Sequence, residues 1–267
     1  RVRSSAASDV YKRQALMAAG NNGSGATDAS QEYNGSSWTA GGTMATAATG
    51  NAAAGILTAA ITMGGEPMPT RSTLSEEYNG SAWTAGGALN NGRAMGAGAG
   101  TQTAALFFGA FDGSTTYAYT ESYNGASWTS ENTLTTPTRQ LAGAGTATAG
   151  LAAAGYNGTA ITAVSEEYNG TSWTAGNSLN TARSKLSGDG LQTAAFVVGG
   201  DTGSASAAME EYDGTDWTTS PASLGTARAT LAAAGTTTLA LAFGGDPAMT
   251  NTEEYTAAAT AQTVTTS

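Results

Sequence analysis

The sequence predicts an all-β fold in which six similar units, each built of four short antiparallel strands, close into a ring. Three observations lead to this prediction. A pattern of about 45 residues recurs along the chain, no segment shows sustained helical periodicity, and glycine, threonine and serine are frequent throughout. A four-stranded unit of this length is typical of a β-propeller blade, which needs neighbouring blades to cover its faces.

One tyrosine and one tryptophan anchor each of the first five units. The tryptophan follows the tyrosine by five residues, and successive tyrosines are 43 to 45 residues apart. These pairs, which we expect to pack between blades, are Tyr33 and Trp38, Tyr78 and Trp83, Tyr123 and Trp128, Tyr168 and Trp173, and Tyr212 and Trp217. A sixth copy at 253–260 keeps its tyrosine and has no tryptophan. Six units in phase predict six blades, and a fragment of a longer ring or array is the alternative.

Each unit is interpreted as strands A to D, named from the centre of the ring outwards. Examples are 95–100 for strand A, 193–198 for strand B and 161–168 for strand C, whereas strand D carries the tryptophan. Asn-Gly or Asp-Gly between C and D predicts a type I′ turn with positive φ at both central residues. Whether the loop has two or four residues, the tyrosine and tryptophan share one face of the hairpin.

The composition fits this arrangement. The 267 residues include 56 alanines and 37 glycines but only 29 leucine, isoleucine, valine and phenylalanine residues, a proportion that by itself would suggest disorder. Glycine and alanine leave room where the inner strands crowd around the axis. The aromatic pairs then fill the wedges between the diverging outer strands.

The two ends are unusual. Residues 1–14 hold four of the ten basic residues, and their wording resembles a translated sequencing-library adapter, which predicts a metagenomic fragment; a genuine basic arm is the alternative. Residues 15–267 are expected to form a single propeller domain. Strand A of the first blade would have to come from around residues 3–9, and residues 257–266 can supply the last strand D.

Composition excludes several functions. Without cysteine or histidine, the chain cannot build a Ser-His-Asp triad, a thiolate nucleophile or a Cys/His metal site. A net charge of −10 disfavours binding to nucleic-acid phosphates. No apolar run approaches the ~18–20 residues of a membrane span. We therefore expect no enzyme activity, no cofactor or metal, no nucleic-acid partner and no membrane insertion.

Acidic pairs precede most of the repeated tyrosines, as in Glu76-Glu77, and could suggest carboxylate catalysis or cation binding. Because the pairs recur in nearly every unit, a structural role is the favoured interpretation. One glutamate would meet a recurring arginine or a backbone N–H, and the other would face water. The arginines assigned to this structural set are Arg93, Arg139, Arg183 and Arg228.

The arrangement resembles the kelch repeat. The match is clearest in VVGG at 197–200, EEYDG at 210–214, Trp217 and Arg228. Ala48 stands where the first unit should have its arginine, and strand B of the third unit ends in Gly109-Ala110. The resemblance implies a six-bladed kelch-like β-propeller of four-stranded antiparallel blades. The wording EEYNGTSWTAG is also similar to repeats in predicted virion proteins of marine bacteriophages.

The B–C loops break the repeat, whereas the C–D turns hardly vary. In an up-and-down blade the B–C and D–A loops emerge on one face, and loops on a rigid scaffold commonly carry function. The candidate recognition residues on this face are Glu66, Arg71, Phe111, Asp112, Tyr117, Tyr156, Asp201 and Asp246. Drift of unselected surface loops would produce the same variability.

These observations favour a non-catalytic interaction or adhesion module. The phage-like wording suggests a virion or tail-fibre component, located on a virion or extracellular surface, that recognises a protein or glycan on a host. A purely architectural virion or cell-surface protein is the first alternative. A glycan-active enzyme is the second, although residues 212–217 match the sialidase Asp-box poorly. A sialidase-like site would also need an arginine cluster, and only Arg71 lies off the periodic arginine positions within the repeats.

Overall fold

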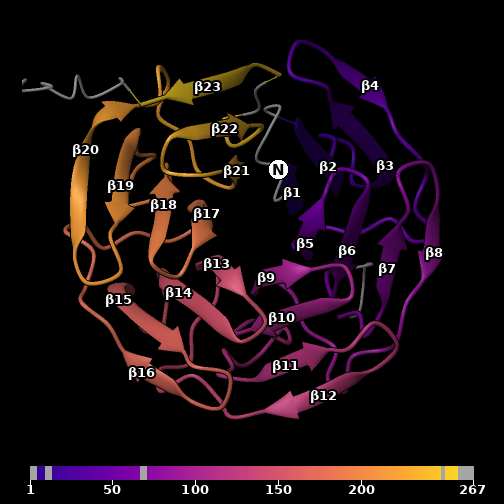
Figure 1. Ribbon diagram of the computed structural model, residues 1–267, viewed down its shortest axis with the longest axis horizontal. Coiled ribbons are helices and arrows are strands. Elements are labelled where there is room, and N and C mark those ends of the chain that lie inside the picture. Colours follow the sequence, from indigo (N-terminus) through magenta and orange to yellow (C-terminus); the bar gives the residue numbers. More distant parts are fainter. Residues whose placement is uncertain (1–4, 10–13, 67–70, 248–249, 258–267) are drawn as a thin grey trace, which may run out of the picture.

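A computed structural model describes residues 5–9, 14–66, 71–247 and 250–257. In these residues the chain forms 23 β-strands and no helix, arranged as six sheets around a common axis (Figure 1). The predicted all-β, six-bladed propeller is confirmed.

The strands follow the chain blade by blade, from the axis outwards. The first two blades consist of β1 (Ser5–Asp9), β2 (Gln14–Asn21), β3 (Ala26–Tyr33), β4 (Trp38–Ala40), β5 (Ala52–Ile56), β6 (Ala59–Met63), β7 (Ser75–Tyr78) and β8 (Trp83–Ala85). The next two consist of β9 (Ala97–Thr101), β10 (Ala104–Phe108), β11 (Thr120–Tyr123), β12 (Trp128–Glu131), β13 (Ala142–Thr146), β14 (Ala149–Tyr156), β15 (Ile161–Tyr168) and β16 (Trp173–Ala175). The last two consist of β17 (Ser187–Leu191), β18 (Ala194–Val198), β19 (Ala208–Tyr212), β20 (Trp217–Ser223), β21 (Ala232–Gly235), β22 (Leu239–Phe243) and β23 (Thr252–Thr256).

The inner strands close the ring. Consecutive strands within each blade pair antiparallel, and each inner strand lies beside the inner strands of both neighbouring blades. The inner strand β1 lies beside both β5 and β21. It therefore forms strand A of the first blade, which was predicted to come from around residues 3–9. Three strands of the sixth sheet are described; the expected fourth, in 257–266, lies outside the described residues except for Ala257.

Glycine in the inner strands permits their close approach. A Cβ added to Gly98 of β9 would stand 2.5 Å from the carbonyl oxygen of Ala53, in the inner strand of the preceding blade. A Cβ on Gly143 of β13 would in turn stand 2.7 Å from the carbonyl oxygen of Gly98. The predicted start of strand A at Met95 is wrong, because Met95 has a φ of 62° and the strand begins at Ala97.

The predicted type I′ turn between strands C and D is also wrong. Tyr33 pairs directly with Trp38, so four residues form the loop, and of these only Gly35 has positive φ. The side-chain oxygen of Asn34 accepts hydrogen bonds from the backbone N–H groups of Ser36 and Ser37, each 3.0 Å long. The asparagine therefore shapes this loop as an Asx turn, and the tyrosine and tryptophan remain on one face as expected.

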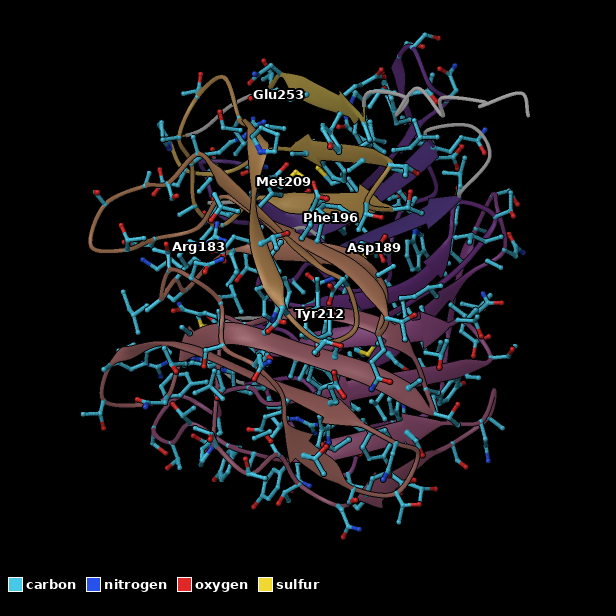
Figure 2. The ribbon with its side chains drawn as sticks, turned by 60° about the vertical axis from the view of Figure 1, so that its left-hand side comes forward. Arg183, Asp189, Phe196, Met209, Tyr212 and Glu253 are labelled. Carbon is cyan, nitrogen blue, oxygen red and sulfur yellow. The ribbon has the colours of Figure 1, made fainter. Side chains whose placement is uncertain are left out.

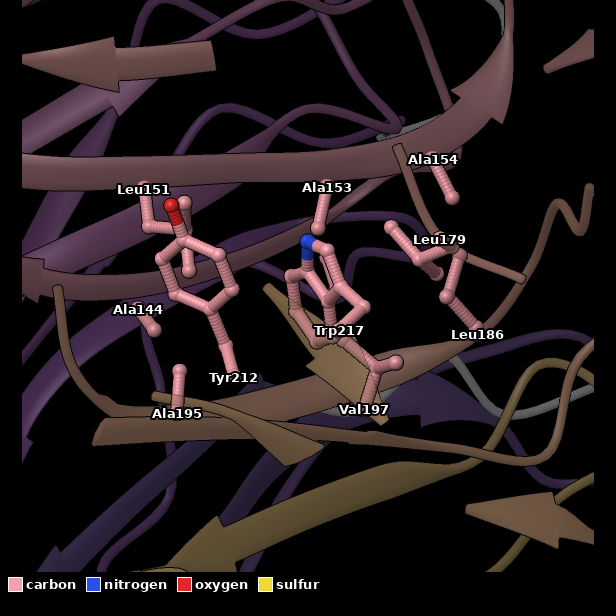
Figure 3. Packing of buried hydrophobic residues seen from close by; sticks show 11 residues of the cluster. Ala144, Leu151, Ala153, Ala154, Leu179, Leu186, Ala195, Val197, Tyr212 and Trp217 are labelled. Atoms are coloured by element: carbon pink, nitrogen blue, oxygen red, sulfur yellow. The ribbon is translucent and has the colours of Figure 1, made fainter. Parts of the chain in front are cut away.

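The hydrophobic core is divided among the interfaces between blades. Tyr212 and Trp217 of the fifth blade pack with their ring centroids 4.9 Å apart. Tyr212 lies beside Leu151 and Trp217 lies beside Ala153, both of the fourth blade, as Figure 3 shows for this interface. Similar clusters occupy the other five interfaces. In four of these, small side chains from one blade and a tyrosine–tryptophan pair from the next complete the core unit; at the interface between the fifth and sixth blades, Tyr255 packs without a tryptophan.

Candidate functional site

The first glutamate of each acidic pair holds the D–A linker that leads into its own blade. Glu210 forms a buried ion pair with Arg183, at 2.8 Å, and also accepts a hydrogen bond from the backbone N–H of Asn180. Where no arginine is present, the linker backbone takes its place: Glu76 accepts from the N–H groups of Ala45 and Thr46. These carboxylates are therefore engaged in holding the linkers.

The second glutamate of a pair joins its blade to the next one. Glu77 accepts a 2.5 Å hydrogen bond from the hydroxyl of Tyr123 in the following blade, and Glu254 of the last blade accepts one of 2.7 Å from Tyr33 of the first. The second glutamate was expected to face water; it is partly exposed, and it also accepts a hydrogen bond from a tyrosine of the next blade. The same bond recurs at Tyr78 with Glu32, at Tyr212 with Glu167, and at Tyr255 with Glu211.

The third blade shows how the bond survives a change in the repeat. Ser122 occupies the position of the second glutamate, so Tyr168 of the next blade loses its usual acceptor. Glu131 of strand β12 replaces it, lying 3.5 Å from the Tyr168 hydroxyl and accepting a 2.6 Å bond from Ser122. The tyrosine–carboxylate link between blades is therefore maintained from a different strand.

These tyrosines make the ring sensitive to high pH. Burial, together with the hydrogen bond to Glu32, raises the pKa of Tyr78 from its ordinary 10.0 to about 12, and burial likewise raises the pKa of Tyr123, Tyr168 and Tyr212. A raised pKa favours the neutral phenol in the folded state, so its stabilising contribution is complete below pH 10 and is lost as pH rises toward 12.

We therefore expect the propeller to unfold cooperatively between about pH 10 and 12, with tyrosinate absorbance and loss of near-ultraviolet circular dichroism changing together. Tyrosinate absorbance that is complete near pH 10 in a protein that remains folded would contradict this prediction.

The indole N–H groups form a second link between blades. Trp83 donates to Ser30 at 3.2 Å and Trp173 donates to Thr120 at 2.9 Å, in each case to the residue three positions before the tyrosine of the preceding blade. The fifth blade has Met209 at this position. The sixth unit, which would have to donate to it, has no tryptophan, so the acceptor and the donor are lost together.

Arg139 does not occupy the structural position assigned to it. The buried arginines lie at steps of 45 residues, at Arg93, Arg183 and Arg228, and the corresponding residue of the fourth blade is Thr138. Arg139 is one residue further on and half-buried, in the row of residues that supports the B–C loops. Grouping it with the structural arginines was wrong, because the distance from the preceding tryptophan varies between 10 and 11 residues.

We define the variable face as the face formed by the B–C loops and D–A linkers. Two rows of residues organise this face, and in each row successive members are 45 residues apart in the sequence. The first row opens the B–C loops at Glu66, Phe111, Tyr156, Asp201 and Asp246. The second row consists of linker residues Thr49, Ala94, Arg139, Ser184 and Ala229. Each linker residue exchanges two backbone hydrogen bonds with the loop residue of its own blade, as in Arg139 with Tyr156 at 3.0 and 2.8 Å. Figure 2 shows Arg183 of the fifth blade's linker on the side from which the long loops project, away from Asp189 of β17.

Four predicted recognition residues come together over the second, third and fourth blades. The guanidinium carbon of Arg139 lies 4.0 Å from the ring centroid of Phe111 and 5.0 Å from that of Tyr156. Arg71, from the second blade, lies 5.5 Å from the same Phe111 ring and forms a 3.0 Å ion pair with Glu66. We call Glu66, Arg71, Phe111, Arg139 and Tyr156 the arginine–aromatic cluster.

Tyr117 and Asp112 belong to the B–C loop of the third blade. The Tyr117 hydroxyl donates to Asp112 at 2.8 Å, and its ring stacks on exposed Tyr119 with centroids 4.4 Å apart. Backbone N–H groups of Thr115 and Ser114 donate to the Asp112 carboxylate and lower its pKa. These contacts hold the loop in one shape beside the cluster.

The remaining candidates lie in the fifth and sixth blades and do not join the cluster. Asp201 forms a 2.8 Å ion pair with Lys185, which is the principal cause of its lowered pKa. Asp246 exchanges two backbone bonds with Ala229 and precedes a cis proline, Pro247. The sequence placed all eight candidates on one face, but it could not show that Arg139 belongs with them.

The described residues also line small cavities away from the variable face, including one of about 80 Å³ between the fifth and sixth blades, beside Phe196, Met209 and Tyr255. Two small cavities along the axis, of about 80 and 70 Å³, are lined largely by alanine and glycine of the inner strands. Among the residues that the structure describes, no group of three or more acidic side chains could hold a metal ion. Within the same residues, no helix has the length and apolarity needed to cross a membrane.

No protein-family model matches the sequence, and no curated protein is significantly similar to it. The six-bladed β-propeller therefore stands on the structure itself, whereas the kelch-like and phage-like wording has no support from these comparisons.

Proposed function

We propose that this protein is a non-catalytic, kelch-like interaction module that binds a partner through its variable face. One observation carries the proposal: chemically different side chains stand at equivalent points of an otherwise uniform ring. Glu66, Phe111, Tyr156, Asp201 and Asp246 share one backbone position, whereas the opposite face repeats nearly the same four-residue turn. Binding residues commonly vary on loops that a rigid scaffold holds in place.

The propeller scaffold suits binding to a macromolecule. The repeated acidic pairs, the usual candidates for catalysis in a chain without histidine or cysteine, are engaged in holding linkers and neighbouring blades. We further propose that the partner is a protein on a host surface and that the module belongs to a phage virion or tail fibre. This finer assignment rests on the wording of the repeats.

The first test exchanges the loops 66–73, 111–119 and 201–206 for Gly/Ser sequences of equal length. Binding of the fluorescently labelled protein to a panel of bacterial strains is measured by flow cytometry. We expect the intact protein to stain some strains and the exchanged protein to stain none at an unchanged melting temperature. The matched control exchanges the C–D turns 79–82 and 124–127 for the sequence at 169–172, and it should stain as the intact protein does.

Equal staining by the loop-exchanged protein would contradict the proposed function. A purely architectural virion protein is the second candidate, favoured by the uniform repeat. Purified particles that carry many symmetric copies, with the variable face buried between them, would support that candidate instead. Capsid or tail genes beside the coding sequence would support the phage assignment.

A further inference from the structure

The side chain of Arg139 does not anchor the linker of its own blade. In the other blades that have an arginine in the structural slot, the guanidinium meets the first glutamate of the acidic pair. In the fourth blade Thr138 fills this slot, and the carboxylate of Glu166 instead accepts hydrogen bonds from the backbone N–H groups of Thr135 and Thr136, at 2.7 and 2.9 Å. The linker is therefore anchored without the Arg139 side chain.

The guanidinium of Arg139 has no acidic partner within the described part of the chain. The other arginines there are each paired with a glutamate: Arg71 with Glu66, Arg93 with Glu121, Arg183 with Glu210 and Arg228 with Glu253. An unpaired guanidinium is unexpected in a chain with twice as many acidic as basic residues. Its positive charge is left available on the variable face.

Two aromatic rings fix the position of this charge. Phe111 from the third blade and Tyr156 from the fourth both lie within 5.0 Å of the guanidinium carbon. Both rings start from backbone positions that paired hydrogen bonds to the linkers hold. A guanidinium held in this way loses little conformational entropy on binding, and its planar edge fits the two oxygens of a carboxylate.

We propose that Arg139, supported by Phe111 and Tyr156, binds a single aspartate or glutamate carboxylate on a protein partner. This inference rests on the proposed function and gives the chemistry by which the variable face would hold its partner. A partly buried arginine flanked by aromatic rings is typical of the residues that dominate protein–protein binding energies.

Two observations favour a protein carboxylate over a polyanion or an acidic sugar. The chain carries a net charge of −10, Glu66 belongs to the cluster through its ion pair with Arg71, and Asp112 directly follows Phe111, so a densely charged ligand such as nucleic acid would be repelled. The guanidinium of Arg139 lies over the rings of both Phe111 and Tyr156, and that of Arg71 also lies over Phe111, so less of each ring is left to stack on a sugar.

The test selects peptides from a random displayed library on the immobilised full-length protein. Each enriched peptide and its Glu→Gln or Asp→Asn counterpart are then titrated by fluorescence anisotropy. We expect the enriched peptides to contain a shared acidic residue. Removing that residue, or introducing Arg139→Ala, should each weaken binding about tenfold or more, and combining the two changes should cost little further. Arg139→Lys should restore only part of the affinity, because the ammonium group lacks the planar fork.

The variants are chosen to fold. Arg139→Ala places in the fourth blade the residue that Ala94 and Ala229 supply at equivalent positions. Ala82→Asp is the control for net charge, because it adds the same negative increment on the opposite face, where the fifth blade already has Asp216. This control should bind every enriched peptide as the unmodified protein does.

Enriched peptides without acidic residues, a library that yields no binder, or equal binding by Arg139→Ala would each overturn the inference. Binding of oligogalacturonate that requires Arg139, in place of peptide binding, would also overturn it and assign the carboxylate to a sugar. Strain staining that is lost on loop exchange but kept by Arg139→Ala would overturn this inference alone and leave the proposed function standing. Staining that survives loop exchange would overturn the proposed function.

Discussion

Arg183→Ala is expected to lower the free energy of unfolding by about 3–5 kcal/mol, because it leaves the buried Glu210 carboxylate without its cation. Both side chains are at most 1% exposed, and the guanidinium also donates to the carbonyl oxygens of Gly199 and Ala208, at 2.9 and 2.8 Å. The substitution therefore removes the linker anchor, the ion pair and two further hydrogen bonds together. Chemical denaturation followed by circular dichroism measures the change.

Arg139→Ala is the matched control for this prediction. It removes the same side chain from a half-buried surface position, where only contacts with aromatic rings are lost, and it should cost about 1 kcal/mol or less. Equal losses of stability for the two variants would show that the structural slot has been assigned to the wrong arginine.

Trp173→Ala is expected to cost about 3–5 kcal/mol, through the cavity left between the third and fourth blades. The indole is 5% exposed and packs on Phe108 of the preceding blade with ring centroids 4.9 Å apart. Since each core unit lies between two blades, the loss should appear in the cooperative unfolding of the whole ring. Thermal and urea denaturation monitored by fluorescence of the remaining tryptophans measures it.

Phenylalanine substitutions separate packing from hydrogen bonding at this site. Trp173 donates a 2.9 Å hydrogen bond to Thr120, whereas the equally buried Nε1 of Trp217 has no hydrogen-bond partner in the described residues. Trp173→Phe should therefore be more destabilising than Trp217→Phe by about 1 kcal/mol. An equal cost for both variants would mean that the indole hydrogen bond contributes nothing to the link between blades.

The sequence predicted the architecture because the same strand pattern recurs in every unit. The constant five-residue step from tyrosine to tryptophan placed both rings on one face, and alanine and glycine identified the crowded inner strands. Strand ends were less accurate. The sequence predicts Met95 in strand A because nothing in its residue type indicates a left-handed backbone, which the surrounding chain imposes.

The sequence predicted which loops form the candidate site, but it did not predict that Arg139 joins the aromatic residues there. The partners of Arg139 come from two different blades, and the angle between blades cannot be obtained from one repeat. A signal was nevertheless present: counting 45 residues on from Arg93 gives Thr138, not Arg139. The tyrosine–glutamate bonds had a comparable signal, since Glu131 appears in the same unit in which Ser122 replaces a glutamate.

The paired backbone bonds beneath the B–C loops have one more consequence. At these positions the main chain supplies both the donor and the acceptor, so the structural role places no demand on the side chain. Acidic, aromatic and small residues all occur at such sites around the ring, as at Asp201, Phe111 and Ala94. The side chains at these positions can consequently be changed in one blade at a time. Each change would alter binding specificity, while the backbone hydrogen bonds of the propeller stay the same.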